Sequence, residues 1–129
     1  MSTVATKKKR PVYLNLVQIR LPLPGFVSIL HRISGALLFV AGLWLLFMLD
    51  RSLASEAGFE SIRRYAGFPL VKLSLLGLVW AYCHHFCAGI RYLLLDLDKG
   101  GDLAMARTTS WVVLGVSLAA TALLGCKLW

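Results

Sequence analysis

The run from Tyr82 to Asp96, YCHHFCAGIRYLLLD, places two adjacent histidines, two cysteines and an arginine inside a long apolar stretch. Imidazole and thiolate groups ligate metal ions. Ionisable side chains inside a membrane are costly unless they are paired, hydrated or bound to a ligand. This cluster therefore indicates a functional site within a hydrophobic segment.

Helical spacing groups part of this cluster on one face. His85, Gly89, Tyr92 and Asp96 are spaced i, i+4, i+7 and i+11, so a helix would carry them along a single stripe. Gly89 has no side chain, which leaves room one turn from His85 for a flat group or another backbone. An imidazole beside such a shelf, in a hydrocarbon interior, is the geometry expected of an axial haem ligand. The alternative is that His85 only hydrogen-bonds to a neighbouring helix.

The adjacent histidine and the cysteines allow other interpretations of this cluster. His84 points about 100° away from His85 on a helix, so the two cannot bind one metal from the same face. A zinc or copper site built from Cys83, His84 and Cys87 fits by ligand softness, but its spacing matches no closed structural site. The odd total of three cysteines, all in apolar runs, favours small packing residues over a disulfide framework.

A second polar cluster, SILHRISG, covers Ser28 to Gly35. Ser28 and Arg32 are four residues apart and His31 lies at i+3, so the three side chains can converge on one helical face. Arg32 and His31 offer donors to a haem propionate, and Ser28 with Arg32 offers donors to a carbonyl such as that of a quinone. Alternatively, Arg32 anchors the helix end to lipid phosphates.

The elements that carry these clusters are long and apolar. The chain has 129 residues, of which 58% are hydrophobic, and its mean hydropathy is +0.72. Three runs, at about 29–49, 69–95 and 109–126, reach the roughly 20 residues that a membrane-crossing helix needs. They lack the period-two alternation of barrel strands. We therefore expect an all-α integral membrane protein of one domain, 1–129, with residues 1–28 as a cytoplasmic N-terminal segment, a loop or short interfacial helix at 50–68 and a turn-rich connection at 96–108.

Basic residues near the spans predict the orientation. Seven fall on the N-terminal side of the first span or in the second loop, and four on the other side; the seven are Lys7, Lys8, Lys9, Arg10, Arg20, Lys99 and Arg107, and the four are Arg51, Arg63, Arg64 and Lys127. The N-terminus is predicted to be cytoplasmic and the C-terminus periplasmic, in a bacterial inner membrane. With three spans following, KKKR and the net charge of +8 are interpreted as this orientation signal and not as a nucleic-acid patch. No apolar stretch follows the basic residues as in a cleavable signal peptide.

Three motifs carry a resemblance to a known family: RPVYLNL at Arg10–Leu16, SILHRISG at Ser28–Gly35, and HFCAGIRYLLLD at His85–Asp96. From Arg10 onward the chain resembles the larger cytochrome b membrane-anchor subunit of succinate dehydrogenase (succinate:quinone oxidoreductase, respiratory complex II) of bacterial type. The resemblance implies three transmembrane helices bundled with a smaller anchor subunit. It also implies docking of an iron-sulfur subunit and a flavoprotein subunit.

The resemblance implies roles for individual residues. His85 would be the axial iron ligand of a haem b shared with the smaller anchor subunit, whose histidine would supply the second ligand. Ser28 and Arg32 would line the ubiquinone site, while His31, Arg32 and Tyr92 would face the haem propionates. Tyr92 stands where the family usually has a second histidine. A phenol donates one hydrogen bond but carries no positive charge.

The dehydrogenase chemistry itself is assigned to partners. The sequence carries no dinucleotide-binding glycine fingerprint and no ferredoxin-like cysteine spacing, so FAD and the iron-sulfur clusters are expected on partner subunits only. Two alternatives remain: a haem and quinol subunit of another dehydrogenase, such as fumarate reductase or formate dehydrogenase, and a non-redox membrane scaffold. Single-chain anchors with two haems need four ligand histidines, and this chain has three histidines in total.

Overall fold

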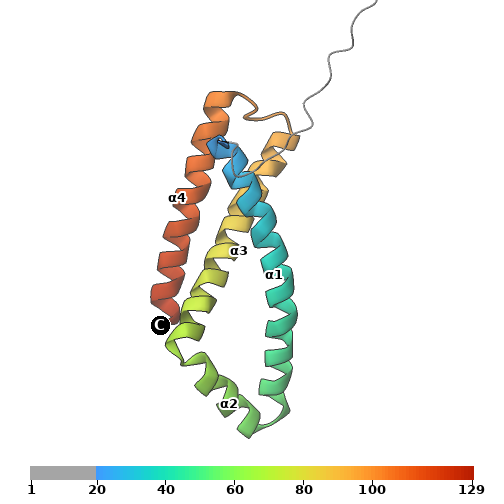
Figure 1. Cartoon of the computed structure of the whole chain (residues 1–129), viewed down its shortest axis with the longest axis vertical. Coiled ribbons are helices and arrows are strands. Elements are labelled where there is room, and N and C mark those ends of the chain that lie inside the picture. Colours follow the sequence, from blue (N-terminus) through green and yellow to red (C-terminus); the bar gives the residue numbers. More distant parts are fainter. Residues whose placement is uncertain (1–19) are drawn as a thin grey trace, which may run out of the picture.

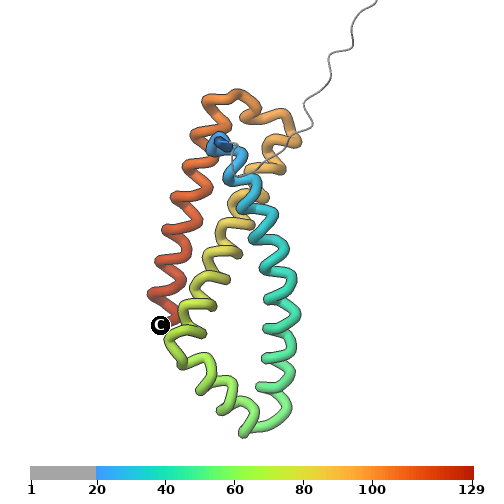
Figure 2. Tube along the Cα trace, viewed as in Figure 1, coloured from blue at the N-terminus to red at the C-terminus, as the bar shows by residue number. Residues whose placement is uncertain are grey.

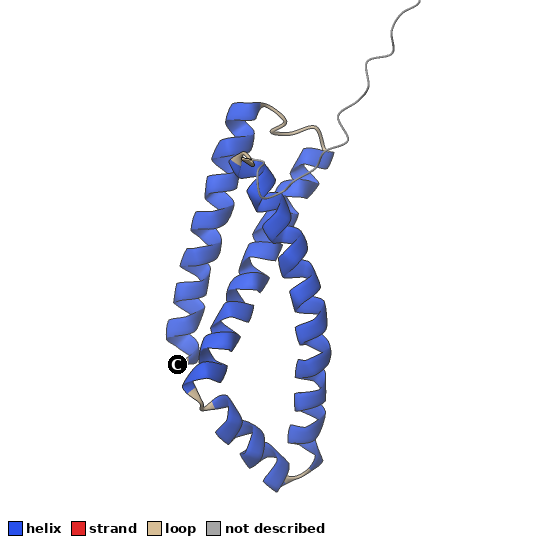
Figure 3. Ribbon diagram, in the orientation of Figure 1, coloured by secondary structure: helices blue, strands red, loops and turns tan. Residues whose placement is uncertain are grey.

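The computed structural model describes residues 20–129, so Lys7–Arg10 and the motif RPVYLNL lie outside the described residues. Four helices follow one another: α1 (Leu23–Ala54), α2 (Glu56–Ala66), α3 (Pro69–Asp96) and α4 (Leu103–Leu128). The described part of the chain contains helices joined by short turns and no strand (Figure 3). The predicted all-α class is confirmed.

Within residues 20–129, three helices, α1, α3 and α4, are long and apolar enough to cross a membrane. The chain runs along α1, turns through the short α2, returns along α3 and runs back along α4 (Figure 1). The start of α1 and the α3–α4 connection lie at one end of the molecule, while α2 lies at the other (Figure 2). The protein is therefore a multi-pass membrane protein.

Two helices begin earlier than their apolar cores. α1 begins at Leu23 because Pro24 falls in its first turn, where a missing N–H breaks no intrahelical hydrogen bond. α4 begins at Leu103, and its first turns, which include Arg107 and Thr108, precede the predicted span at 109–126. At 1.5 Å per residue the 32 residues of α1 span about 48 Å, more than the roughly 30 Å hydrocarbon core. Six residues counted in the predicted N-terminal segment, 23–28, belong to α1.

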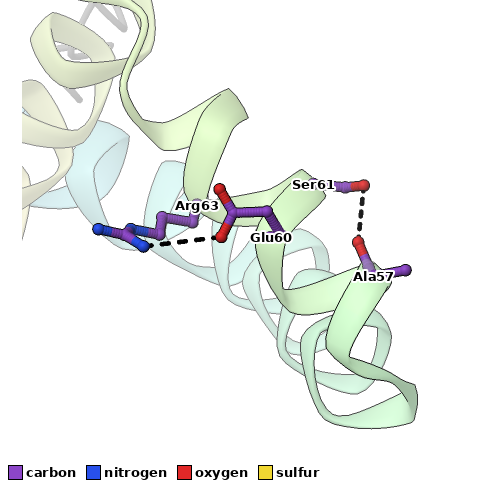
Figure 4. A network of polar contacts seen from close by, with 4 residues as sticks. All are labelled: Ala57, Glu60, Ser61 and Arg63. Carbon is purple, nitrogen blue, oxygen red and sulfur yellow. Dashed lines mark hydrogen bonds and ion pairs between the residues drawn. The ribbon is translucent and has the colours of Figure 1, made fainter.

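The segment between the first two spans forms a helix, α2, one of the two possibilities drawn from its sequence. The Ser55 hydroxyl caps it by accepting a hydrogen bond of 3.0 Å from the Gly58 N–H. Along the helix, Ser61 donates to the Ala57 carbonyl at 2.8 Å and Arg63 lies 3.6 Å from Glu60 (Figure 4). A contact between the Trp44 and Tyr65 rings, with centroids 6.2 Å apart, joins α2 to α1.

α3 lies at the centre of the bundle and packs mainly against α1 and α4. One small buried side chain from each of the three long helices, Val27, Ala88 and Val113, forms a core cluster. α4 presents a buried stripe of Ser110, Val113, Ser117 and Thr121, spaced by three or four residues. Small residues at such positions let helix backbones approach closely in a membrane.

Enlarging the smallest core residue is expected to weaken the bundle. Ala88 is fully buried, so Ala88→Leu must push α1 or α4 aside, at a cost of about 1–3 kcal/mol in free energy of unfolding. The measurement is thermal unfolding in detergent followed by circular dichroism. The control Ala119→Leu adds the same atoms at an exposed position on α4 and should leave the midpoint unchanged. Equal midpoints for both variants would contradict this description of the core.

Candidate functional site

The two histidine clusters meet where α1 and α3 cross. The rings of His31 and His85 stack with centroids 4.2 Å apart and planes 9° from parallel. The Nδ1 atom of His85 lies 3.0 Å from the backbone carbonyl oxygen of His31 and 3.3 Å from the hydroxyl of Ser34. The imidazole of α3 is therefore held by groups on one turn of α1, and residues 54 positions apart form one site.

A glycine makes this crossing possible. A Cβ atom built at Gly35 would lie 2.8 Å from the Cε1 atom of His85, which is closer than real Cβ contacts allow. Only glycine lets the His85 ring rest against α1 here. Ser34 and Gly35 were not assigned a role from the sequence, although both lie in the motif SILHRISG, three and four residues after His31.

The space beside Gly89, which was predicted to be open, is occupied by the His31 ring. A Cβ atom built at Gly89 would lie 3.8 Å from the Nε2 atom of His31, so the absent side chain faces the His31 ring. The Tyr92 ring lies next in line, with its centroid 5.1 Å from that of His31. The hydroxyl of Tyr92 is buried and has no hydrogen-bond partner within residues 20–129. A buried phenol O–H without an acceptor suits a site that receives an acceptor from outside this chain.

Ser28 and Arg32 contact each other along α1. The Arg32 guanidinium donates a hydrogen bond of 3.3 Å to the Ser28 hydroxyl. Arg32 is exposed and Ser28 half-buried, whereas the His31 ring turns inward to α3. The structure thus brings Ser28 and Arg32 together, while the His31 ring contacts α3.

Arg91 faces α4 and not the histidines. Its Nε atom donates to the Thr109 hydroxyl at 3.0 Å, and one terminal nitrogen lies 3.5 Å from the Ala106 carbonyl. The side chain is only 7% exposed, so the cation lies within the protein. Arg91 therefore ties α3 to the first turns of α4.

His84 occupies the interior of the bundle. It is fully buried and stacks on Trp80, with ring centroids 5.3 Å apart. Neither of its ring nitrogens, nor the Trp80 Nε1, has a hydrogen-bond partner within residues 20–129. Its neighbours Cys83 and Cys87 are free thiols, and no group of three or more His, Cys, Asp or Glu side chains that could hold a metal ion occurs in this part of the chain.

The fold and the two clusters define a helical multi-pass membrane protein whose histidines from α1 and α3 meet at one helix crossing. A comparison with known families narrows this class. The family described as succinate dehydrogenase/fumarate reductase transmembrane subunit matches residues 6–124, so the chain belongs to this family. It is a membrane subunit of an enzyme complex.

Individual relatives agree with this assignment. The succinate dehydrogenase cytochrome b556 subunit of Coxiella burnetii is 33% identical over 94% of this chain and 98% of its own. The subunits of the same name from Rickettsia felis and Paracoccus denitrificans are 31% and 32% identical, over 90% and 84% of this chain and 90% and 84% of theirs. The resemblance drawn from the three sequence motifs is confirmed.

Proposed function

We propose that this chain is the haem b-binding membrane anchor of a succinate dehydrogenase, which docks the catalytic subunits and contributes to the site of ubiquinone reduction. The observation that carries the proposal is the anchoring of the His85 ring through Nδ1 to α1. Relatives named cytochrome b556 subunits of succinate dehydrogenase support it over nearly the whole chain.

The residues present fit a haem. Metal-ligating histidines usually donate the second ring N–H to a carbonyl or carboxylate, and His85 meets the His31 carbonyl in this way. The buried phenol of Tyr92 and the His31 ring beside it supply hydrogen-bond donors for a propionate, and Arg32 supplies a charge on the same helix as His31. Haem b, when bound, supplies a one-electron carrier whose potential depends on its axial ligands and burial.

The second axial ligand is assigned to the smaller anchor subunit. His84 is enclosed in this chain's own core, and the His31 ring is stacked on His85. His85 is therefore this chain's single ligand in the proposal. The haem would lie between the two anchor subunits and help to hold them together.

The quinone contact is assigned to Ser28 and Arg32. Their hydrogen bond holds a hydroxyl and a guanidinium side by side near the start of α1. Both groups can donate to a carbonyl oxygen, and the positive charge stabilises negative charge that develops on that oxygen during reduction. We assign this end of the bundle to the cytoplasmic face of the inner membrane, where the iron-sulfur and flavoprotein subunits would dock, because the basic flanking residues favour that orientation.

A second candidate is the corresponding subunit of a fumarate reductase, because the matching family includes both enzymes. The relatives reported above are all named for succinate dehydrogenase, which favours the first candidate. The two share the site described here. They are separated by the reaction that the purified complex performs with succinate and with a quinol plus fumarate.

The deciding experiment is a dithionite-reduced minus air-oxidised absorption spectrum of the complex, purified through a tag on this chain in mild detergent. A sharp low-spin b-type band is expected. A flat spectrum from a preparation that retains its partner subunits would remove His85 as an iron ligand, and would leave a quinone-binding or purely structural anchor.

Replacing Tyr92 by histidine should be tolerated. The imidazole would lie beside the His31 ring and would restore the residue that the family usually has at this position. We expect unchanged haem content and band position, measured by the pyridine haemochrome assay and the difference spectrum. Tyr92→Phe serves as the control, because it removes the hydroxyl and keeps the ring. Loss of haem in Tyr92→His would mean that this position does not face the propionates.

A further inference from the structure

The contacts of His85 determine which of its ring nitrogens carries the proton. Nδ1 lies 3.0 Å from the carbonyl oxygen of His31, and a carbonyl oxygen can only accept a hydrogen bond. An unprotonated Nδ1 would direct its lone pair at this oxygen, which is repulsive. The neutral ring therefore carries its proton on Nδ1.

Ser34 strengthens this assignment. Its hydroxyl donates to the same His31 carbonyl at 2.9 Å, so its own proton is engaged within α1. The oxygen that faces Nδ1 at 3.3 Å then offers a lone pair. Both acceptors around Nδ1 belong to one turn of α1, and both favour a proton on Nδ1.

Gly35 fixes where the ring can lie. The Cε1 atom between the two ring nitrogens sits against the backbone at Gly35, closer than any side chain at that position would permit. The ring is therefore set both by contact with α1 and by the direction of its Nδ1–H bond.

We propose that the segment His31–Gly35 is a positioning element that holds His85 as the Nδ1–H tautomer and presents Nε2 as the iron-ligating atom. The inference rests on the proposed function for the identity of the metal. The tautomer itself is a property of this chain's own contacts. Ser34 and Gly35 act through His85, so they are positioning residues.

The test is nitrogen-15 NMR of the full-length chain, labelled at histidine, prepared without haem in lipid nanodiscs and purified through a tag without histidine. The chain has three histidines, and each is assigned by the signals lost in His31→Gln, His84→Gln and His85→Gln. We expect the His85 proton on Nδ1, whereas free neutral histidine favours the proton on Nε2. A proton on Nε2 of His85 would overturn the inference.

Gly35→Ala tests whether the close contact with Gly35 fixes the position of the His85 ring. The added Cβ displaces the His85 ring from the His31 carbonyl, so we expect loss of the pure Nδ1–H signal and a roughly 10- to 100-fold loss of haem affinity, as for other groups that orient a metal ligand. Gly42→Ala is the matched control, because a Cβ at Gly42 on the same helix meets nothing within 4 Å. An unchanged tautomer and unchanged haem content in Gly35→Ala would overturn the steric part.

The two proposals fail separately. A wild-type complex that binds haem while His85 carries its proton on Nε2 would refute the positioning element and keep the proposed function. A wild-type chain with the Nδ1–H tautomer and no haem in its native complex would refute the proposed function and support the positioning element. The wild-type tautomer decides the inference even if Gly35→Ala fails to assemble.

Discussion

Replacement of His85 by alanine is expected to abolish the b-type absorption band of the purified complex. In our proposal His85 is the only iron ligand that this chain supplies, and alanine offers no replacement. The ring is half-buried, and it does not belong to the buried core cluster of Val27, Ala88 and Val113. The bundle should therefore still fold. The measurement is haem per complex by the pyridine haemochrome assay, with subunit content from gel densitometry.

His84→Leu is the matched control for this experiment. It removes a neighbouring imidazole whose two buried nitrogens have no hydrogen-bond partner within residues 20–129. Replacing unpartnered polar atoms by an apolar side chain of similar size is close to neutral or stabilising. The band should persist in His84→Leu. A band lost in His84→Leu and kept in His85→Ala would reverse the assignment of ligand and packing residue.

The second large effect is expected at Arg32. Arg32→Gln removes the positive charge but keeps a side chain that can hydrogen-bond to Ser28, and quinone reduction should fall by about 100-fold, as when one donor to a developing oxyanion is lost. Succinate oxidation with an artificial acceptor that bypasses the membrane subunits should be unchanged. The measurement is the ratio of the two activities in one preparation.

Two further variants complete the design. Ser28→Ala removes the partner of Arg32 at 3.3 Å and should lower the same ratio by a smaller factor. Arg107→Gln removes an exposed cation from the start of α4 and should leave the ratio unchanged. A parallel loss of both activities in Arg32→Gln would indicate defective assembly and would contradict a quinone contact at this position.

The elements were predictable from the sequence because membrane crossing depends on local hydropathy and length. The three spans lie within α1, α3 and α4. The ends of the helices were harder to predict from the sequence. α1 includes Pro24 in its first turn, and α4 includes Arg107 and Thr108, which a hydropathy criterion leaves out of a membrane span. Helix formation does not stop where the apolar run stops.

The candidate site was predictable only where neighbours share one helix. The Ser28–Arg32 contact follows from their four-residue spacing and is present. The contact between His85 and Ser34 depends on how α1 and α3 are rotated about their axes, which no single segment specifies. For the same reason the contact of Arg91 with Thr109 on α4 could not be predicted from the sequence of α3.

The buried stripe of α4 bears on how far relatives can diverge in sequence while keeping the bundle. The hydroxyls of Ser110, Ser117 and Thr121 donate to carbonyls of α4 itself, at 2.7, 3.0 and 2.7 Å. These side chains therefore pack against α3 through their small size and do not donate hydrogen bonds to it. Exchanges among serine, alanine, glycine and cysteine keep these side chains small. Residue identity along α4 can therefore change during evolution while the close packing of α3 against α4 is kept. Distant members of the family should be recognisable here by the spacing of small side chains.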